Sequence, residues 1–111
     1  VGRLAHKAMS EEKFEEAMKM LLESLKYGNN SKRLFINLYT CFVRTGNKVE
    51  SGKLSLYLNN RFRNQIDFDE TLELAVLAEN AKFDKQSDFW YDKAESHFGL
   101  PPSPETFPPK P

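Results

Sequence analysis

The chain of 111 residues lacks the features that mark several large classes of protein. Its single cysteine, Cys41, excludes an internal disulfide framework and a cysteine cluster for zinc. No apolar run approaches the roughly 18 residues of a membrane-spanning helix, so membrane insertion is not expected. Proline is absent from the first 100 residues, which leaves long stretches free to form helices. With 40% apolar residues, the chain is suited to one globular core.

The net charge is zero, but the charges are unevenly distributed along the chain. Residues 31–64 carry seven basic residues and one acidic residue, whereas residues 65–99 carry three basic and nine acidic residues. The two regions can neutralise each other within the fold, or the basic region can present a strip to an anionic partner. Both interpretations stay open from the sequence.

The sequence repeats itself with a period of 35 residues. A shift of this length aligns three small residues, Ala17, Gly52 and Ser87. It also aligns three residues suited to closing a helix: Asn29, Asn64 and Gly99. Apolar residues at helical spacing indicate two helices in each copy. We therefore predict an all-α fold, an α-α superhelix (solenoid) of three helical-hairpin repeats over residues of about 1–29, 30–64 and 65–99.

Several local expectations accompany this fold. Ser10 is expected to cap the second helix of the first copy, and Gly28 and Gly46 are expected to end helices. Gly52 is expected at a helix crossing, where a small residue lets two backbones approach closely. The second helix of the middle copy is expected to bury five apolar residues: Val49, Leu54, Leu56, Tyr57 and Leu58.

The joins and turns of the copies carry a family resemblance. Residues 99–107 read Gly-Leu-Pro-Pro-Ser-Pro-Glu-Thr-Phe, and residues 65–72 are a weaker version of the same join. Together with the turn Arg44-Thr45-Gly46, they resemble the pentatricopeptide repeat family over nearly the whole chain. The resemblance implies that residues 100–111 are a Pro-rich tail or a linker to a further repeat, and that further repeats are possible at either end.

The resemblance also implies organellar, and specifically mitochondrial, RNA metabolism. In that family two side chains per repeat read one base of single-stranded RNA. By position, the resemblance assigns Leu38 with Phe68 and Glu73 with Ser103, and a slip of one residue puts Asn37 in place of Leu38. Contacts to RNA phosphates then fall to the basic side chains of the middle copy: Lys32, Arg33, Arg44, Lys48, Arg61 and Arg63.

The expected function is therefore that of a non-catalytic binding module. It would belong to an organellar RNA-metabolism or translation protein and associate with single-stranded RNA or a ribonucleoprotein, and a protein partner is expected as well. The alternative is a protein–protein adaptor or scaffold subunit without direct RNA contact. No catalytic residue, metal ligand or cofactor is expected, because His6 and His97 have no partners at ligand or triad spacing and Cys41 has the surroundings of a buried, inert thiol.

Overall fold

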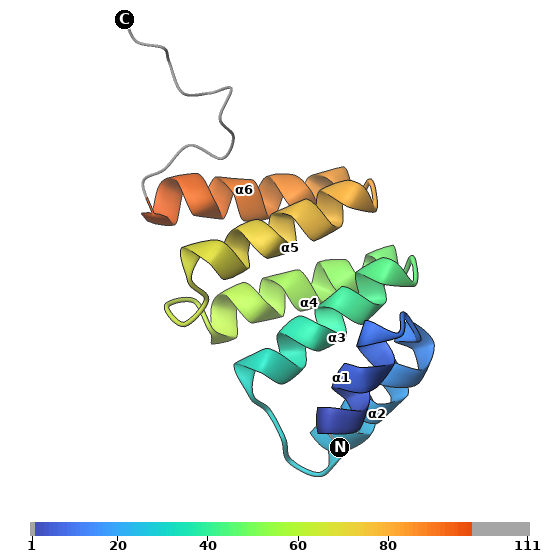
Figure 1. Cartoon of the computed structure of the whole chain (residues 1–111). Coiled ribbons are helices and arrows are strands. Elements are labelled where there is room, and N and C mark those ends of the chain that lie inside the picture. Colours follow the sequence, from blue (N-terminus) through green and yellow to red (C-terminus); the bar gives the residue numbers. More distant parts are fainter. Residues whose placement is uncertain (1, 99–111) are drawn as a thin grey trace, which may run out of the picture. The chain divides into compact units, whose positions relative to one another are not determined.

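The computed structural model describes residues 2–98, without the side chains of Arg3, His6 and Phe98. The described residues form six α-helices and no strand, which confirms the all-α prediction (Figure 1). The helices are α1 (Gly2–Ser10), α2 (Phe14–Lys26), α3 (Lys32–Arg44), α4 (Lys48–Arg61), α5 (Phe68–Asn80) and α6 (Asp84–Phe98). The predicted tail 100–111, with Ser103, lies outside the described residues. None of the helices within residues 2–98 has the length and apolar character needed to cross a bilayer.

The chain divides into two units, residues 1–65 and residues 66–111. The first unit contains two helical hairpins, α1 with α2 and α3 with α4, and the second unit contains the hairpin of α5 and α6. In each hairpin the two helices pack against each other and are joined by three residues. In the first unit α2 also packs against α3, so α3 lies between two neighbouring helices (Figure 1).

The three hairpin turns share one backbone geometry. The middle residue of each turn has a positive φ, with values of 60° at Glu12, 80° at Gly46 and 65° at Lys82. The next amide in each turn donates to a carbonyl five residues earlier, at 2.8 to 2.9 Å. This is the Schellman closure, which satisfies carbonyl groups at a helix end. The same closure, with Gly28 at a φ of 97°, ends α2. The prediction that Gly28 and Gly46 end helices is therefore confirmed.

The start of α2 differs from the expectation. Ser10 is the last residue of α1, and its hydroxyl donates to the Lys7 carbonyl at 2.8 Å. Helix α2 begins only at Phe14, and the preceding Lys13 makes no side-chain cap. The expectation that Ser10 caps α2 was wrong because the left-handed Glu12 closes α1 between the two positions.

Two later helices begin with side-chain caps. The Ser31 hydroxyl accepts a hydrogen bond from the Leu34 amide at 3.2 Å and so caps α3. At the start of α5, Asp67 and Glu70 form a reciprocal capping box, in which each carboxylate accepts from the other residue's amide at 2.8 and 3.0 Å. Because such caps satisfy amides that have no partner within the helix, they fix where each hairpin starts.

The core of the first unit is centred on α3. Seven of its thirteen residues are buried: Leu34, Phe35, Ile36, Leu38, Tyr39, Cys41 and Val43. The Phe35 ring lies 5.1 Å from the Tyr57 ring and 5.8 Å from the Phe62 ring, measured between centroids. The side of α3 that is not buried carries Arg33, Asn37, Thr40 and Arg44 at helical spacing, so the helix stays amphipathic although two neighbouring helices pack against it.

The hairpins do not repeat at a constant interval. Their second helices begin at residues 14, 48 and 84, so the copies are 34 and then 36 residues apart. The fourth residue of each of these helices is Ala17, Ser51 or Ser87, and all three are buried. Each serine hydroxyl donates to the carbonyl three residues earlier, at 3.0 Å. The small buried residue of α4 is therefore Ser51. Gly52 was expected at this position, and this expectation was wrong by one residue, because Gly52 is only half-buried.

The core of the second unit combines one very large side chain with smaller ones. Trp90 of α6 is completely buried and contacts Phe89 edge to face, with 4.9 Å between the ring centroids. The Tyr91 hydroxyl of α6 donates to the Glu79 carboxylate of α5 at 2.7 Å. The remaining core side chains of the two helices include Thr71, Leu74, Ala75, Ala78 and Ala94. Four of these five are small, which allows α5 and α6 to approach each other closely.

Candidate binding surfaces

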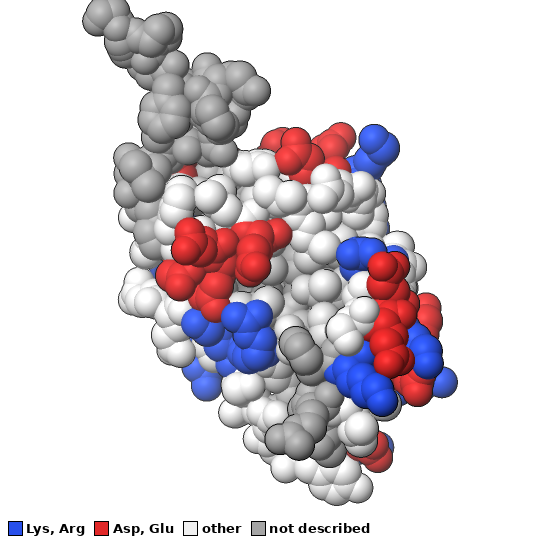
Figure 2. Space-filling view, viewed as in Figure 1, with Lys and Arg blue, Asp and Glu red and all other residues white. Residues whose placement is uncertain are grey.

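The six predicted phosphate contacts fall into two groups in the first unit. Lys32 and Arg33 lie in the first turn of α3, at the same end of the hairpin as Arg61 and Arg63 at the end of α4. Arg44 and Lys48 flank the turn at the opposite end, about 18 Å away along α3. On the face shown in Figure 2, the basic side chains likewise form separate groups with uncharged and acidic atoms between them. The cations therefore do not form one continuous strip.

Lys32, Arg44 and Arg61 illustrate the contacts that these cations make within the described part of the unit. The Lys32 ammonium donates to the Gln65 carbonyl at 2.7 Å and so ties the start of α3 to the residues after α4. The Arg44 guanidinium lies 4.6 Å from the centre of the Phe14 ring and 3.8 Å from the Glu12 carboxylate. The Arg61 guanidinium lies over the Phe62 ring, 4.9 Å from its centroid. These cation–π contacts hold the side chains on the surface without removing their charge.

The predicted base-facing residues have different surroundings. Leu38 is only 3% exposed in the core of the first unit, so its side chain is not available to a base. Asn37, the alternative position, is half-buried on α3. Glu73 is exposed on α5 in the second unit, and Phe68 is half-buried at the start of the same helix. The fourth candidate, Ser103, lies outside the described residues.

The outer face of α4 exposes apolar side chains that the sequence pattern assigned to the core. Val49 is 65% exposed and Leu56 is 56% exposed, and Tyr57 is also exposed although its ring touches Phe35. Leu58 is buried as expected and Leu54 is half-buried. The other buried positions on α4 are Ser51 and Ser55. The expectation was wrong for Val49, Leu56 and Tyr57, because small hydroxyl side chains, bonded to carbonyls of their own helix, occupy much of the packed face. Apolar residues consequently lie on the solvent side.

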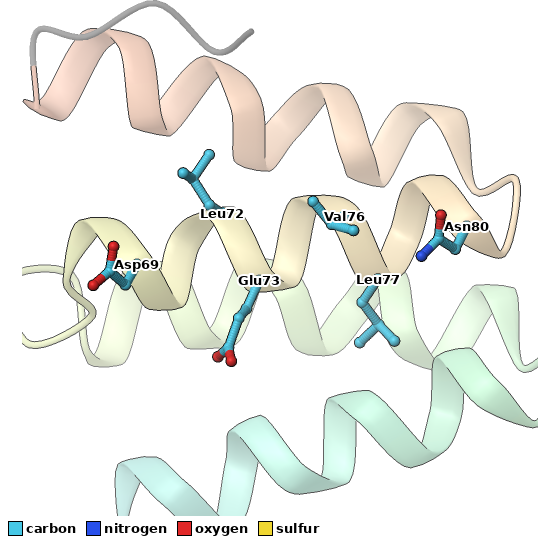
Figure 3. Close-up of a pocket in the computed structure, with 6 residues that line it drawn as sticks. All are labelled: Asp69, Leu72, Glu73, Val76, Leu77 and Asn80. Atoms are coloured by element: carbon cyan, nitrogen blue, oxygen red, sulfur yellow. The ribbon is translucent and has the colours of Figure 1, made fainter. Parts of the chain in front are cut away.

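A shallow hollow of about 450 Å³ runs along one face of α5 (Figure 3). Its described lining contains three apolar residues, two carboxylates and one amide: Leu72, Val76, Leu77, Asp69, Glu73 and Asn80. In Figure 3 Leu72 points to one side of the helix, and Glu73 and Leu77 point to the other. Glu73 in this lining is one of the predicted base-facing residues, but the hollow itself was not predicted, although α5 contains four acidic residues and no basic residue.

The only cysteine is unsuited to nucleophilic chemistry in this fold. Cys41 is buried in α3, and burial raises the pKa of its thiol from 9.0 to about 11, with a smaller contribution from the charge of Glu15. The thiolate is the reactive form of cysteine, so the thiol is protonated and unreactive at neutral pH. No group of three or more His, Cys, Asp or Glu side chains among the described residues is arranged to hold a metal ion.

Comparison with known proteins does not assign the chain to a family. The chain matches no family model, no curated protein and no solved structure. The resemblance to the pentatricopeptide repeat family therefore stays a prediction.

Proposed function

We propose that this chain is a non-catalytic helical-repeat binding module whose partner is a protein. The observation that supports this proposal is the apolar outer face of α4, which exposes Val49, Leu56 and Tyr57. A surface helix normally turns polar residues toward water, and contiguous exposed apolar residues mark interaction sites. Lys53 is exposed on the same face, between Val49 and Leu56. We therefore expect the partner to present apolar side chains around a carboxylate.

The repeated hairpin geometry is consistent with such a role. We propose that the three hairpins are repeats of an α-α solenoid, in which each copy buries its face against its neighbour. The shared three-residue turns and the buried small residues Ala17, Ser51 and Ser87 support this interpretation. Solenoids of helical hairpins offer extended binding surfaces, and the exposed face of α4 would be part of such a surface.

The α4 face can be tested by site-specific photocrosslinking in an extract of the source cells. A photoreactive residue in place of Leu56 should form a protein adduct of defined mass that resists ribonuclease. The same residue in place of Lys19, which is exposed on α2, serves as the control and should form no such adduct. Combining the Leu56 probe with Val49→Ser and Lys53→Glu should remove the adduct. An adduct that ribonuclease destroys, or equal labelling from both positions, would contradict the proposal.

A second candidate function is association with single-stranded RNA or a ribonucleoprotein. It is favoured by the grouping of Lys32, Arg33, Arg61 and Arg63 at one end of the α3–α4 hairpin. Four cations close together provide phosphate contacts that do not depend on base sequence. The mitochondrial setting implied by the family resemblance belongs to this candidate and stays a prediction.

RNA association can be tested with a fluorescent 30-nucleotide oligouridylate at about 50 mM salt, where phosphate-driven binding is strong. The double variant Arg61→Glu with Arg63→Glu should bind much more weakly than the parent. The variant Lys19→Glu with Lys26→Glu changes the net charge equally at exposed positions on α2, and it should retain binding. If the parent does not bind at this salt concentration, RNA association is eliminated for this chain.

A further inference from the structure

The hollow on α5 combines an apolar floor with unbalanced negative charge. Leu72 and Leu77 are half-buried in it, and Val76 is 43% exposed. Asp69 and Glu73 lie one helical turn apart at its N-terminal end, and Asn80 lies at its C-terminal end. The apolar part favours contact with an apolar side chain, and the paired carboxylates favour a cation beside it.

Neither carboxylate of the hollow is paired within the described residues of its own unit, 66–98. Asp69 and Glu73 make no side-chain hydrogen bond or ion pair with residues 66–98. Like charges four residues apart on a helix repel each other. Residues 66–98 also carry nine acidic and three basic residues, so the surroundings add to the negative potential. A cation from outside would relieve this repulsion.

From these observations we infer that the α5 hollow binds a basic amphipathic helix of a partner protein. This inference rests on the proposed function, because it specifies the partner's chemistry at a second surface of the same module. The partner places apolar side chains against Leu72 and Val76, and a lysine or arginine against Asp69 and Glu73. RNA is unsuited to this surface because the two carboxylates repel a phosphate backbone.

The length of the hollow sets the size of the occupant. Residues 69 to 80 of α5 extend for about 16 Å, which is three helical turns. A partner helix of the same length presents two or three apolar residues at spacings of three and four, which is the usual pattern for a helix bound in a groove. Its basic residue lies one turn beyond the apolar ones, so that it reaches the carboxylate end of the hollow.

The inference can be tested with defined peptides and fluorescence anisotropy. The probe is a labelled 15-residue amphipathic helix with three leucines on one face and two lysines one turn away. Two comparison peptides replace the lysines by glutamates or the leucines by serines. We expect the chain to bind the first peptide at least tenfold more tightly than either comparison peptide. Raising the salt from about 50 to 200 mM should weaken this binding, because exposed charges are screened.

Matched variants of the chain locate the binding site. Asp69→Lys with Glu73→Lys should weaken peptide binding at least tenfold, and Val76→Asp should do the same without altering the circular dichroism spectrum. The control Asp88→Lys with Glu95→Lys makes the same change in net charge at exposed positions of α6, and its affinity should stay within twofold of the parent.

Three results would overturn the inference. The first is that the chain binds the glutamate peptide as tightly as the lysine peptide. The second is that the α6 control variant weakens peptide binding as much as Asp69→Lys with Glu73→Lys does. The third is that the chain self-associates in sedimentation experiments without peptide and that Asp69→Lys with Glu73→Lys abolishes this self-association. The last result would make a second copy of the chain the occupant. If the peptide does not bind while the Leu56 adduct on α4 persists, this inference fails and the proposed function stands.

Discussion

The two units of this chain reach a buried core in different ways. In the first unit α3 lies between two helices and buries a series of large side chains, among them Leu38 and Tyr39. In the second unit Trp90 is the largest fully buried side chain, and small residues such as Ala75 and Ala94 make up much of the remaining core. The units also differ in charge, because basic residues predominate in residues 1–65 and acidic residues in residues 66–98. The comparison shows that one hairpin pattern supports both a distributed core and a core with one dominant side chain.

The largest expected effect is the loss of the dominant side chain in the second unit. Trp90→Ala should lower the free energy of unfolding of residues 66–98 by about 3–5 kcal/mol, because it leaves a cavity that small neighbours cannot fill. Hydrogen exchange followed by mass spectrometry should show lost protection in α5 and α6 and retained protection in α3. The exposed Tyr27→Ala is a matched aromatic truncation and should change stability by less than about 0.5 kcal/mol. Equal loss of protection in both units would break the comparison between them.

A smaller effect is expected from overpacking the first unit at α4. Ser51→Leu should destabilise the unit by about 1–3 kcal/mol, because Ser51 is completely buried and has no space for a larger side chain. Gly52→Leu, at the neighbouring half-buried position, should cost less. Thermal melts followed by circular dichroism measure both changes. Trp90 is the only tryptophan, so its fluorescence reports the second unit separately. If Gly52→Leu destabilises the unit more than Ser51→Leu does, Gly52 is the tightly packed position and the constant period of 35 residues is supported.

The smallest expected effect is a difference between the two units in how their stability falls at alkaline pH. Burial raises the pKa of Cys41 in the first unit to about 11, and burial together with the hydrogen bond to Glu79 raises the pKa of Tyr91 in the second unit to about 12. Both groups stay protonated in the folded chain at pH values where the unfolded chain ionises. Stability should therefore fall as pH rises from about 9 to 11 in the first unit and from about 10 to 12 in the second.

Urea unfolding at several pH values measures this difference. Cys41→Ala should remove the pH dependence that begins near pH 9, and Tyr91→Phe should remove the part that begins near pH 10. Tryptophan fluorescence should respond only to the second substitution. An unchanged pH profile in either variant would show that the substituted group does not carry the alkaline effect.

Much of the fold follows from short-range signals in the sequence. Gly28 and Gly46 end helices because glycine adopts positive φ without strain. The positions of these glycines after apolar helical patterns are visible in the sequence, so both helix ends could be predicted. The helical spacing of the apolar residues is also a local pattern, and it predicted the all-α class. Glu12 and Lys82 adopt the same left-handed conformation without being glycine, so their turns gave no comparable signal, and the start of α2 was misplaced as a result.

The candidate surfaces were harder to predict because burial depends on packing between helices. Ser51 and Ser55 are buried although serine is polar, since each hydroxyl is satisfied by a carbonyl of its own helix. Leu56 is exposed although leucine is apolar. A fixed period of 35 also concealed the true intervals of 34 and 36, which placed Gly52 rather than Ser51 at the buried position. The basic residues are visible in the sequence, but only the structure shows that they lie in two groups at opposite ends of α3.

The uniform turns within the hairpins have a consequence for how such a chain diverges. The turns have three residues each, whereas the segments between hairpins have five residues after α2 and six residues after α4. An insertion between hairpins moves a complete hairpin along the chain and leaves its internal contacts intact. An insertion inside a turn disrupts the closure and both helices. Related chains should therefore gain and lose residues mainly between α2 and α3 and between α4 and α5, while the lengths of the turns are inherited unchanged.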